Sequence, residues 1–209
     1  AYHRIRVPEF TVVRPGRKVA LPKRLTFPLI VKSLFFEAST GISQASVVEN
    51  QEQLAKRATF IHEKLGTAAI VEQFIDGREL YVGVLGNERL EVLPVWEMEF
   101  AKMPENRWRI ATERVKWRTR HQKANGIMTD AARLDASAMT QIQRMAKRAY
   151  RALDLNGYAR IDLRLDQQGR AYVLEANPNP NLAYGEDFAE SAEVYGLSYE
   201  KLLERIITL

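Results

Sequence analysis

The sequence predicts an α+β fold in two lobes that divide near Asp76. Helical periodicity and short alternating strands occur in mixed order along the chain, as in helices packed on antiparallel sheets. The turn signals Asp76-Gly77 and Gly86-Asn87 separate successive strand-like segments. With 209 residues, 46% of them apolar, the chain is long enough for each lobe to bury a core. We therefore expect a first lobe over residues 1–76 and a second over residues 77–209.

The first predicted lobe contains strands, a loop and one helix. Residues 10–13 read as extended, and the run FPLIVK at residues 27–32 reads as a buried strand. The small, polar residues 37–41 that follow predict a loop. Asn50 can cap a helix that Gly66 closes. The apolar positions of this helix recur at helical spacing: Leu54, Ala58, Ile61 and Leu65.

Further along the chain, the pattern changes between strands and helices several times. Residues 68–75, 79–85 and 90–95 read as three strands, and residues 101–125 lack a clean period and read as a long functional loop. The remaining predicted elements are a helix over residues 136–153, a hairpin over residues 157–177 and a helix that begins near Ser198.

The composition excludes several kinds of site. The chain has no cysteine and three histidines, so a metal here must take mostly oxygen ligands. Its apolar runs are far shorter than the roughly 20 residues that a membrane span needs, and we expect a soluble, cytoplasmic protein. The net charge of +5 is concentrated between residues 107 and 123. The basic residues there are Arg107, Arg109, Arg114, Lys116, Arg118, Arg120 and Lys123.

The segment ARIDLRLDQQGRAYVLEAN, residues 159–177, predicts a hairpin with one polar and one apolar face. A turn that closes with Asp166 opposite Gly169 places Arg160 opposite Glu175 and Asp162 opposite Val173. In that register, four polar side chains project from one face: Arg160, Asp162, Glu175 and Asn177. A register shifted by one residue would turn the charges toward the core.

Two carboxylates and an amide oxygen on one sheet face suit a hard cation such as Mg²⁺. Arg160 would balance the carboxylates and reach a phosphate oxygen. From the alternation alone, a solvated sheet face with an Arg–Glu cross-strand pair is an equal alternative.

These residues resemble a known family. Glu175-Ala176-Asn177-Pro178 after Arg160-Ile161-Asp162 is similar to the metal-binding hairpin of the ATP-grasp superfamily, in its D-alanine–D-alanine ligase-like branch. Three further blocks resemble that family in the same order. Residues 27–43 resemble its nucleotide-lysine strand and phosphate loop, residues 71–79 resemble its adenine-binding linker, and Val115-Lys116-Trp117 resembles its Lys-aromatic pair. The resemblance implies an ATP-grasp fold, in which two α+β lobes with antiparallel sheets sandwich the nucleotide.

The resemblance also implies a role for each block around ATP. Lys32 would reach the α- and β-phosphates, and the backbone N–H groups of the loop with Ser39, Thr40 and Gly41 would cover the γ-phosphate. Glu72 would accept from the adenine amino group, and backbone atoms of Phe74 and Ile75 would pair with the adenine ring. Glu79 would bind the ribose hydroxyls. Without the neighbouring blocks, Lys32 and Glu72 would read as surface residues.

The implied reaction is a ligation in two steps. A carboxylate attacks the γ-phosphorus of ATP to give an acyl phosphate, and an amine then attacks the acyl group. Two Mg²⁺ ions, Lys32, Lys116 and Arg160 would neutralise the transferring phosphoryl group. Glu175 would bridge the metal ions, while Asp162 and Asn177 would each hold one.

The sequence departs from the family at the substrate end. The family's Ser-Pro-Gly becomes Asn179-Pro180-Asn181, and Glu186 and Asp187 fall where a carboxylate-binding serine and its neighbour are expected. These acids would disfavour a carboxylate and favour a cationic or amine-rich second substrate, unless they only decorate the first turn of a helix.

The family's N-terminal domain and its first nucleotide lysine are not in this sequence, so we expect that domain to complete the enzyme. The expected partners are therefore that domain and small acid and amine substrates, with a homodimer as one option for the oligomeric state. Nucleic acid and membranes are not expected partners. The alternatives to a ligase are a nucleotide-binding domain without catalysis and, less favoured, a basic nucleic-acid-binding module.

Overall fold

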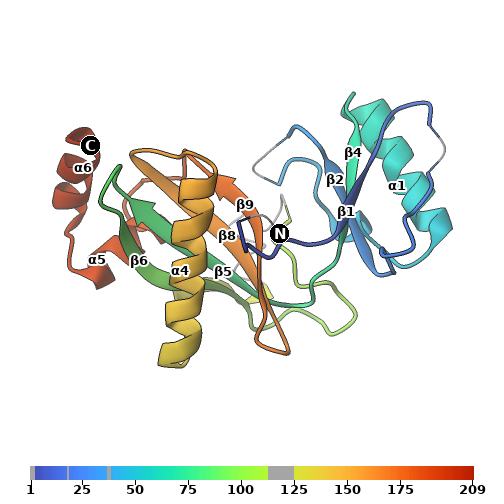
Figure 1. Ribbon diagram of the computed structural model, residues 1–209. Helices are drawn as coiled ribbons and strands as arrows, with labels where there is room; N and C mark the ends of the chain where they lie inside the picture. Colours follow the sequence, from blue (N-terminus) through green and yellow to red (C-terminus); the bar gives the residue numbers. More distant parts are fainter. Residues whose placement is uncertain (1–2, 18, 37–38, 113–124) are drawn as a thin grey trace. The chain divides into compact units, whose positions relative to one another are not determined.

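The chain forms two compact units, each with its own sheet and helices, in the computed structural model (Figure 1). The structure describes residues 3–17, 19–36, 39–112 and 125–209. The four-stranded unit comprises Pro8–Ile75 and Phe100–Ile127, and the five-stranded unit comprises Ala1–Val7, Asp76–Glu99 and Met128–Leu209. The predicted α+β class is confirmed. Residues 100–127 group with the first unit, whereas the sequence placed them in the second lobe, and the lobe ranges themselves stay a prediction.

The four-stranded sheet has the strand order β1-β4-β2-β3. Its strands are β1 (Phe10–Val13), β4 (Ala69–Gln73), β2 (Leu29–Ser33) and β3 (Val47–Val48). Burial alternates along β2, because Leu29 and Val31 are buried while Ile30 and Lys32 are half-buried. One face of the sheet therefore forms a core, and the other face carries Lys32.

Helix α1 (Gln51–Lys64) supplies the other half of that core. Asn50 caps it by accepting a hydrogen bond from the Gln53 N–H at 3.0 Å, as the sequence predicts. Leu54, Ala58 and Ile61 pack in one cluster with the buried side chains of β2 and β4. A short 3₁₀ helix, η1 (Gln44–Ser46), and β3 lie between the predicted loop and α1, and the sequence did not predict either.

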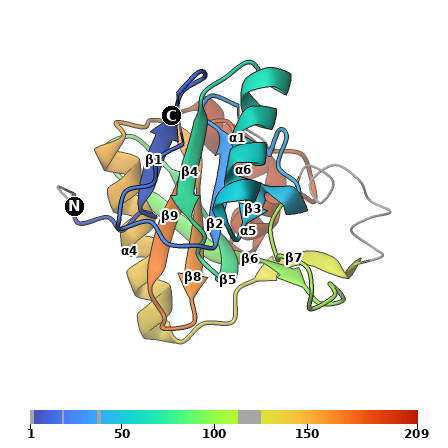
Figure 2. The same cartoon turned by 90° about the vertical axis from the view of Figure 1, so that its right-hand side faces the viewer.

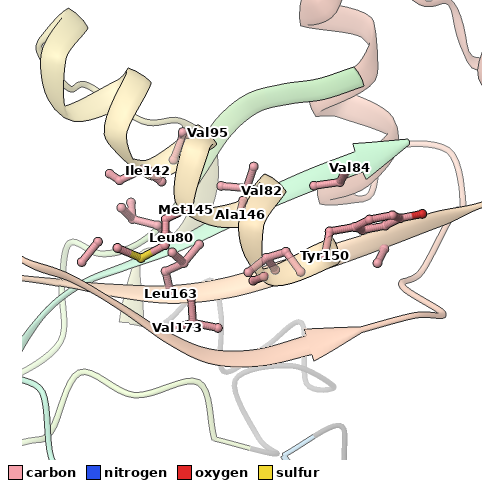
Figure 3. Close-up of a cluster of buried hydrophobic side chains, with 14 of the residues drawn as sticks. Leu80, Val82, Val84, Val95, Ile142, Met145, Ala146, Tyr150, Leu163 and Val173 are labelled. Carbon is pink, nitrogen blue, oxygen red and sulfur yellow. The ribbon is translucent and has the colours of Figure 1, made fainter. Parts of the chain in front are cut away.

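The five-stranded sheet has the order β7-β6-β5-β8-β9, with antiparallel registers from β6 to β9. Its strands are β7 (Ile127–Ala131), β6 (Glu91–Phe100), β5 (Gly77–Leu85), β8 (Tyr158–Asp166) and β9 (Ala171–Asn177). Strand β7 was not predicted. Helix α4 (Ala136–Ala152), capped by Asp135, covers one face (Figure 2). There Leu80, Val82 and Val84 of β5 meet Ile142, Met145, Ala146 and Tyr150 of α4 (Figure 3).

Two C-terminal helices pack on the opposite face of this sheet at one end. Helix α5 (Asp187–Tyr195) and helix α6 (Tyr199–Ile207) bury Phe188 and Leu202 against Leu85 and Leu93. Leu85 is an odd-numbered residue of β5, so it faces away from the even-numbered residues under α4. Ser198 caps α6, which begins where the sequence predicts its last helix. Further along this face, β5 carries Glu79 and Tyr81, which lie opposite Met98 and Trp96 of β6.

The β8–β9 hairpin was predicted with the wrong register. The Asp166 N–H donates to the Arg170 carbonyl, so the turn contains three residues instead of the expected two. Arg160 lies opposite Asn177 and Asp162 opposite Glu175, whereas the sequence prediction paired them with Glu175 and Val173.

The four polar side chains still share one face of the sheet, because two one-residue shifts add together. The odd turn moves the register by one residue, and an irregularity between Asp162 and Leu163 moves it by one more, leaving Leu174 as the extra residue. Side chains in a strand alternate with a period of two, so a total shift of two restores the predicted face.

No helix among the described residues is long and apolar enough to cross a membrane.

Candidate functional site

The candidate residues of the five-stranded unit lie on its polar face. On β8, Arg160, Asp162 and Arg164 alternate with apolar residues that face α4. Their direct neighbours on β5 and β9 extend the face sideways. We call this set the polar ladder; it consists of Glu79, Tyr81, Arg160, Asp162, Arg164, Glu175 and Asn177.

Arg160 and Asp162 form a two-bond ion pair within the ladder. The Arg160 Nε and Nη2 donate to the two carboxylate oxygens of Asp162 at 2.7 and 2.9 Å. The same guanidinium lies 4.5 Å from the Tyr81 ring centroid, and its Nη1 lies 3.7 Å from Asp187 Oδ2. Burial lowers the pKa of Arg160, but the charge of Asp162 and its hydrogen bonds raise that pKa more, so the guanidinium stays charged.

The three predicted metal ligands lie next to one another on this face. Asp162 is buried and directly opposite Glu175, which is exposed, and Asn177 is two residues further along β9. Oxygen donors of this kind suit Mg²⁺. Among the residues that the structure describes, no group of three or more His, Cys, Asp or Glu side chains could hold a metal ion, so the set depends on the Asn177 amide. The three residues fit a magnesium site, and their role as ligands stays a prediction.

Arg164 and Tyr81 are two members of the ladder that sequence reasoning gave no role. Arg164 Nη2 donates to Glu79 Oε2 at 2.7 Å, and the Tyr81 hydroxyl donates to Glu79 Oε1 at 3.0 Å. Burial and the charge of Glu79 raise the pKa of Tyr81 well above its usual value, so the hydroxyl keeps its proton. Glu79 is thus a buried carboxylate held from two sides. The alternation along β8 was the available signal for Arg164.

In the four-stranded unit, Lys32 and Glu72 form an ion pair on the face away from α1. Their strands pair so that Ile30 is opposite Glu72 and Lys32 opposite Ile70, which makes Lys32 and Glu72 diagonal neighbours. The two predicted nucleotide contacts on these strands therefore come together.

Phe74 and Ile75 follow β4 and are both buried. Phe74 packs with Val47 and Ile110 on the same face as Ile30, and Trp108 meets its ring edge-on with a centroid distance of 5.1 Å. The Gln44 side-chain amide makes two hydrogen bonds with the backbone of Trp108. The Trp108 N–H donates to Gln44 Oε1 at 2.8 Å, and the Trp108 carbonyl accepts from Gln44 Nε2 at 2.9 Å. An apolar wall beside Lys32 and Glu72 suits a flat aromatic ring. The sequence did not predict Gln44, Trp108 or Ile110 as part of it.

The predicted phosphate loop forms a tight turn. The Ile42 N–H donates to the Ser39 carbonyl at 2.8 Å, and Ser39 and Gly41 have positive φ values of 61° and 70°. Thr40 is exposed at the turn. A positive φ at the third residue of such a turn favours glycine, which explains Gly41.

The predicted substrate residues lie between β9 and α5. Asn177 Oδ1 accepts from the Asn179 N–H at 2.9 Å, Asn179 Oδ1 accepts from the Tyr158 hydroxyl at 3.3 Å, and Asn181 Oδ1 accepts from the Ala183 N–H at 3.1 Å. Glu186 is the N-cap residue of α5 without a side-chain capping bond. Asp187 begins α5 and faces Arg160. The two acids therefore lie at the start of a helix, as the alternative interpretation expects.

The predicted catalytic residue Lys116 lies outside the described residues, as do Arg114, Arg118, Arg120 and Lys123. The candidate site residues that are described divide between the two units. Lys32, Glu72 and the phosphate loop belong to one, and the polar ladder belongs to the other.

Comparison with known proteins gives consistent matches. A family model described as "D-ala D-ala ligase C-terminus" matches residues 2–208. The chain is 32% identical over 200 residues to the uncharacterized protein y4sG of Sinorhizobium fredii, covering 96% of this chain and 56% of that protein. It is also 32% identical over 187 residues to a D-alanine–D-alanine ligase of Desulfotalea psychrophila, covering 88% of this chain and 54% of that protein.

Among solved structures, the D-alanine–D-alanine ligase from Bacillus anthracis complexed with ATP aligns with a TM-score of 0.77 and 21% identity. The alignment covers 99% of this chain and 61% of that chain. The likeness confirms the ATP-grasp fold expected from the resemblance. The chain spans about 54–56% of the length of the two curated relatives described above.

Proposed function

This chain belongs to the family of the D-alanine–D-alanine ligase C-terminal region, and from that premise we propose that the whole protein is an ATP- and Mg²⁺-dependent ligase. It joins a carboxylate to an amine, and the carboxylate is activated as an acyl phosphate. The observation that carries the proposal is the polar face on which Arg160, Asp162, Glu175 and Asn177 lie together.

Each proposed role follows from the chemistry of the side chain. Asp162, Glu175 and Asn177 offer oxygen ligands to Mg²⁺. A bound Mg²⁺ ion would neutralise part of the phosphate charge. Arg160 is a fixed cation that can pair with a phosphoryl oxygen, because its planar guanidinium still has donors beyond the two that Asp162 occupies. Positioning and charge neutralisation are the main requirements of phosphoryl transfer, and no protein nucleophile is needed.

The nucleotide contacts are assigned from the family resemblance. Lys32 neutralises phosphate charge, the turn of Ser39, Thr40 and Gly41 donates backbone N–H groups, and Glu72 accepts from the adenine amino group. The buried wall with Phe74 and Ile75 provides the apolar side of the adenine site, and Glu79 binds the ribose hydroxyls. Lys116 stabilises the transferring phosphoryl group in this proposal.

The second substrate is proposed to be an amine with a cationic or amide-bearing body. Asp187 already places a carboxylate 3.7 Å from Arg160, and Glu186 precedes it. A substrate carboxylate beside these acids would meet like charges in a partly desolvated place. The full-length protein should therefore make D-alanyl-D-alanine more slowly than it couples basic or amide-bearing acceptors.

The proposal is tested by ADP release from the full-length protein. Release should require Mg²⁺, an acid and an amine together, and omission of the amine should leave at most a slow background. Mg-ATP binding without turnover on any acid and amine would favour a nucleotide-binding domain without catalysis, and ADP release that needs no acid would show ATP hydrolysis in place of ligation. A thermal shift with RNA or DNA and none with Mg-ATP would overturn the proposal in favour of the basic module.

A further inference from the structure

Arg57 is a buried arginine on the core-facing side of α1. It lies on the same side as Leu54, Ala58 and Ile61, and only 7% of its surface is exposed. Burying a guanidinium is costly unless its N–H groups find hydrogen-bond acceptors. An arginine at this position therefore needs specific partners.

Arg57 finds its partners in the segment that leads from the predicted phosphate loop to β3. Its Nη2 donates to the Gly41 carbonyl and, at 2.7 Å, to Ser46 Oγ. Its guanidinium carbon lies 4.5 Å from the Phe60 ring centroid on the same helix. Among the described residues, no ion pair of Arg57 with a carboxylate is found. Arg57 thus holds neutral oxygens of a loop.

Both acceptors of Arg57, the Gly41 carbonyl and Ser46 Oγ, lie in parts of the loop that are closed by hydrogen bonds within the loop. Ser46 Oγ also accepts from the Ser43 N–H at 3.0 Å, and the Ser46 N–H donates to the Ser43 carbonyl at 2.9 Å. Gly41 is the third residue of the turn that the Ile42 N–H closes on Ser39. One guanidinium therefore joins the end of this turn and η1 to helix α1.

We infer that Arg57 is a positioning residue for the phosphates of the nucleotide, an inference that rests on the proposed function. Along the chain, the peptide N–H groups of Thr40 and Gly41 follow the Ser39 carbonyl, which accepts from Ile42, and precede the Gly41 carbonyl that Arg57 holds. Donors held in place before binding lose less conformational freedom when an anion arrives. Arg57 itself touches neither the nucleotide nor the reacting atoms in this account.

The experiment compares nucleotides that do and do not carry the outer phosphates. In the full-length protein, Arg57→Met should weaken ATP binding about 10-fold, the scale of one charge-assisted hydrogen bond, while AMP binding changes less than about 2-fold. Arg57→Lys should recover part of the loss, because one ammonium nitrogen can donate to both acceptors, as Nη2 does. Ser46→Ala, which removes one acceptor, should shift the same ATP-to-AMP ratio in the same direction by a smaller factor.

The control is Lys56→Met, which removes the neighbouring positive charge of α1. Lys56 is exposed and pairs only with Glu52 in the described part of the chain, so its loss should leave the ratio unchanged. Equal losses for ATP and AMP in Arg57→Met and Ser46→Ala would overturn the inference in favour of a purely structural role.

The two proposals fail in different ways. If the wild-type protein binds no ATP, the proposed function falls and this inference falls with it. If the wild type binds ATP and the variants keep its ATP-to-AMP ratio, only the role of Arg57 is lost. Should Arg57→Met not fold, which circular dichroism would report, Ser46→Ala carries the same comparison and decides it.

Discussion

Arg164 and Arg57 are both buried arginines, but the two units hold them in different ways. Arg164, 4% exposed, pairs with Glu79 across neighbouring strands, so the register of β5 and β8 sets its partner. Arg57 reaches from a helix to a backbone carbonyl and a serine hydroxyl. In the five-stranded unit, charges are therefore ordered by strand pairing. In the four-stranded unit, one arginine of α1 adds to the hydrogen bonds that a loop makes within itself.

The largest expected effect tests whether the ladder serves chemistry more than stability. Glu175→Gln in the full-length protein should reduce the proposed ligation about 10³-fold or more, because the loss of a carboxylate proposed to bridge the metal ions removes several kcal/mol of transition-state stabilisation. Glu175 is exposed, so the free energy of unfolding should stay within about 0.5 kcal/mol of the wild type. Rates of ADP release and urea unfolding measure the two quantities. Loss of folding with the activity would show that Glu175 is structural.

The next effect separates the two buried arginines by stability. Arg164→Met leaves Glu79 as a buried carboxylate without its guanidinium and should cost about 3–5 kcal/mol of unfolding free energy. Arg57→Met leaves two neutral oxygens and should cost about 1–3 kcal/mol. Urea unfolding of both variants gives the comparison.

The matched control is the double variant Glu79→Gln with Arg164→Met. It removes both charges of the pair, so it should recover more than half of the loss caused by Arg164→Met. If the double variant is no more stable than the single one, packing of the arginine stem matters more than the charge pair.

A smaller effect is expected at the ion pair of the four-stranded unit. Lys32→Ala should weaken Mg-ATP binding by about 1–3 kcal/mol, the scale of one charge-assisted phosphate contact. Isothermal titration of the full-length protein measures this change, with Lys56→Ala as a control that also removes one lysine charge. An unchanged dissociation constant would remove Lys32 from the nucleotide site and leave it only the ion pair with Glu72.

Local patterns predicted most of the helices and strands, but not η1, β3 or β7. Asn50 caps the helix that the sequence assigned to it, and α6 begins near Ser198 as predicted. The alternation in residues 159–177 predicted a hairpin with a polar face. The register was wrong, because neither the three-residue turn nor the irregularity beside Asp162 leaves a mark in a period-two pattern. The face was right, because the two shifts add to one full period.

The parts that sequence reasoning missed depend on contacts between distant segments. Gln44 and Trp108 are 64 positions apart, and Arg164 and Glu79 are 85 apart. Arg57 sits at a helical position that periodicity assigns to the core, where an arginine looks out of place until its acceptors in the loop are known. The hydrophobic pattern along one helix or strand does not predict which residue of another element its side chains contact.

The smallest expected effect concerns two glycines with left-handed backbone, one in each unit. Gly169 lies in the β8–β9 turn with φ of +73°, and an added Cβ would meet no atom within 4 Å, so Gly169→Ala should cost about 1 kcal/mol of unfolding free energy from backbone strain alone. Its Mg-ATP affinity should be unchanged, because the irregularity beside Asp162 lies between the turn and the strand pairs that carry the proposed metal ligands. At Gly41 the added Cβ would also lie 2.9 Å from Leu65 Cδ1, so Gly41→Ala should weaken Mg-ATP binding as well. Titration and urea unfolding of both variants test this contrast. Weaker Mg²⁺ dependence in Gly169→Ala would mean that the turn, and not the irregularity, sets the register of Asp162 and Glu175.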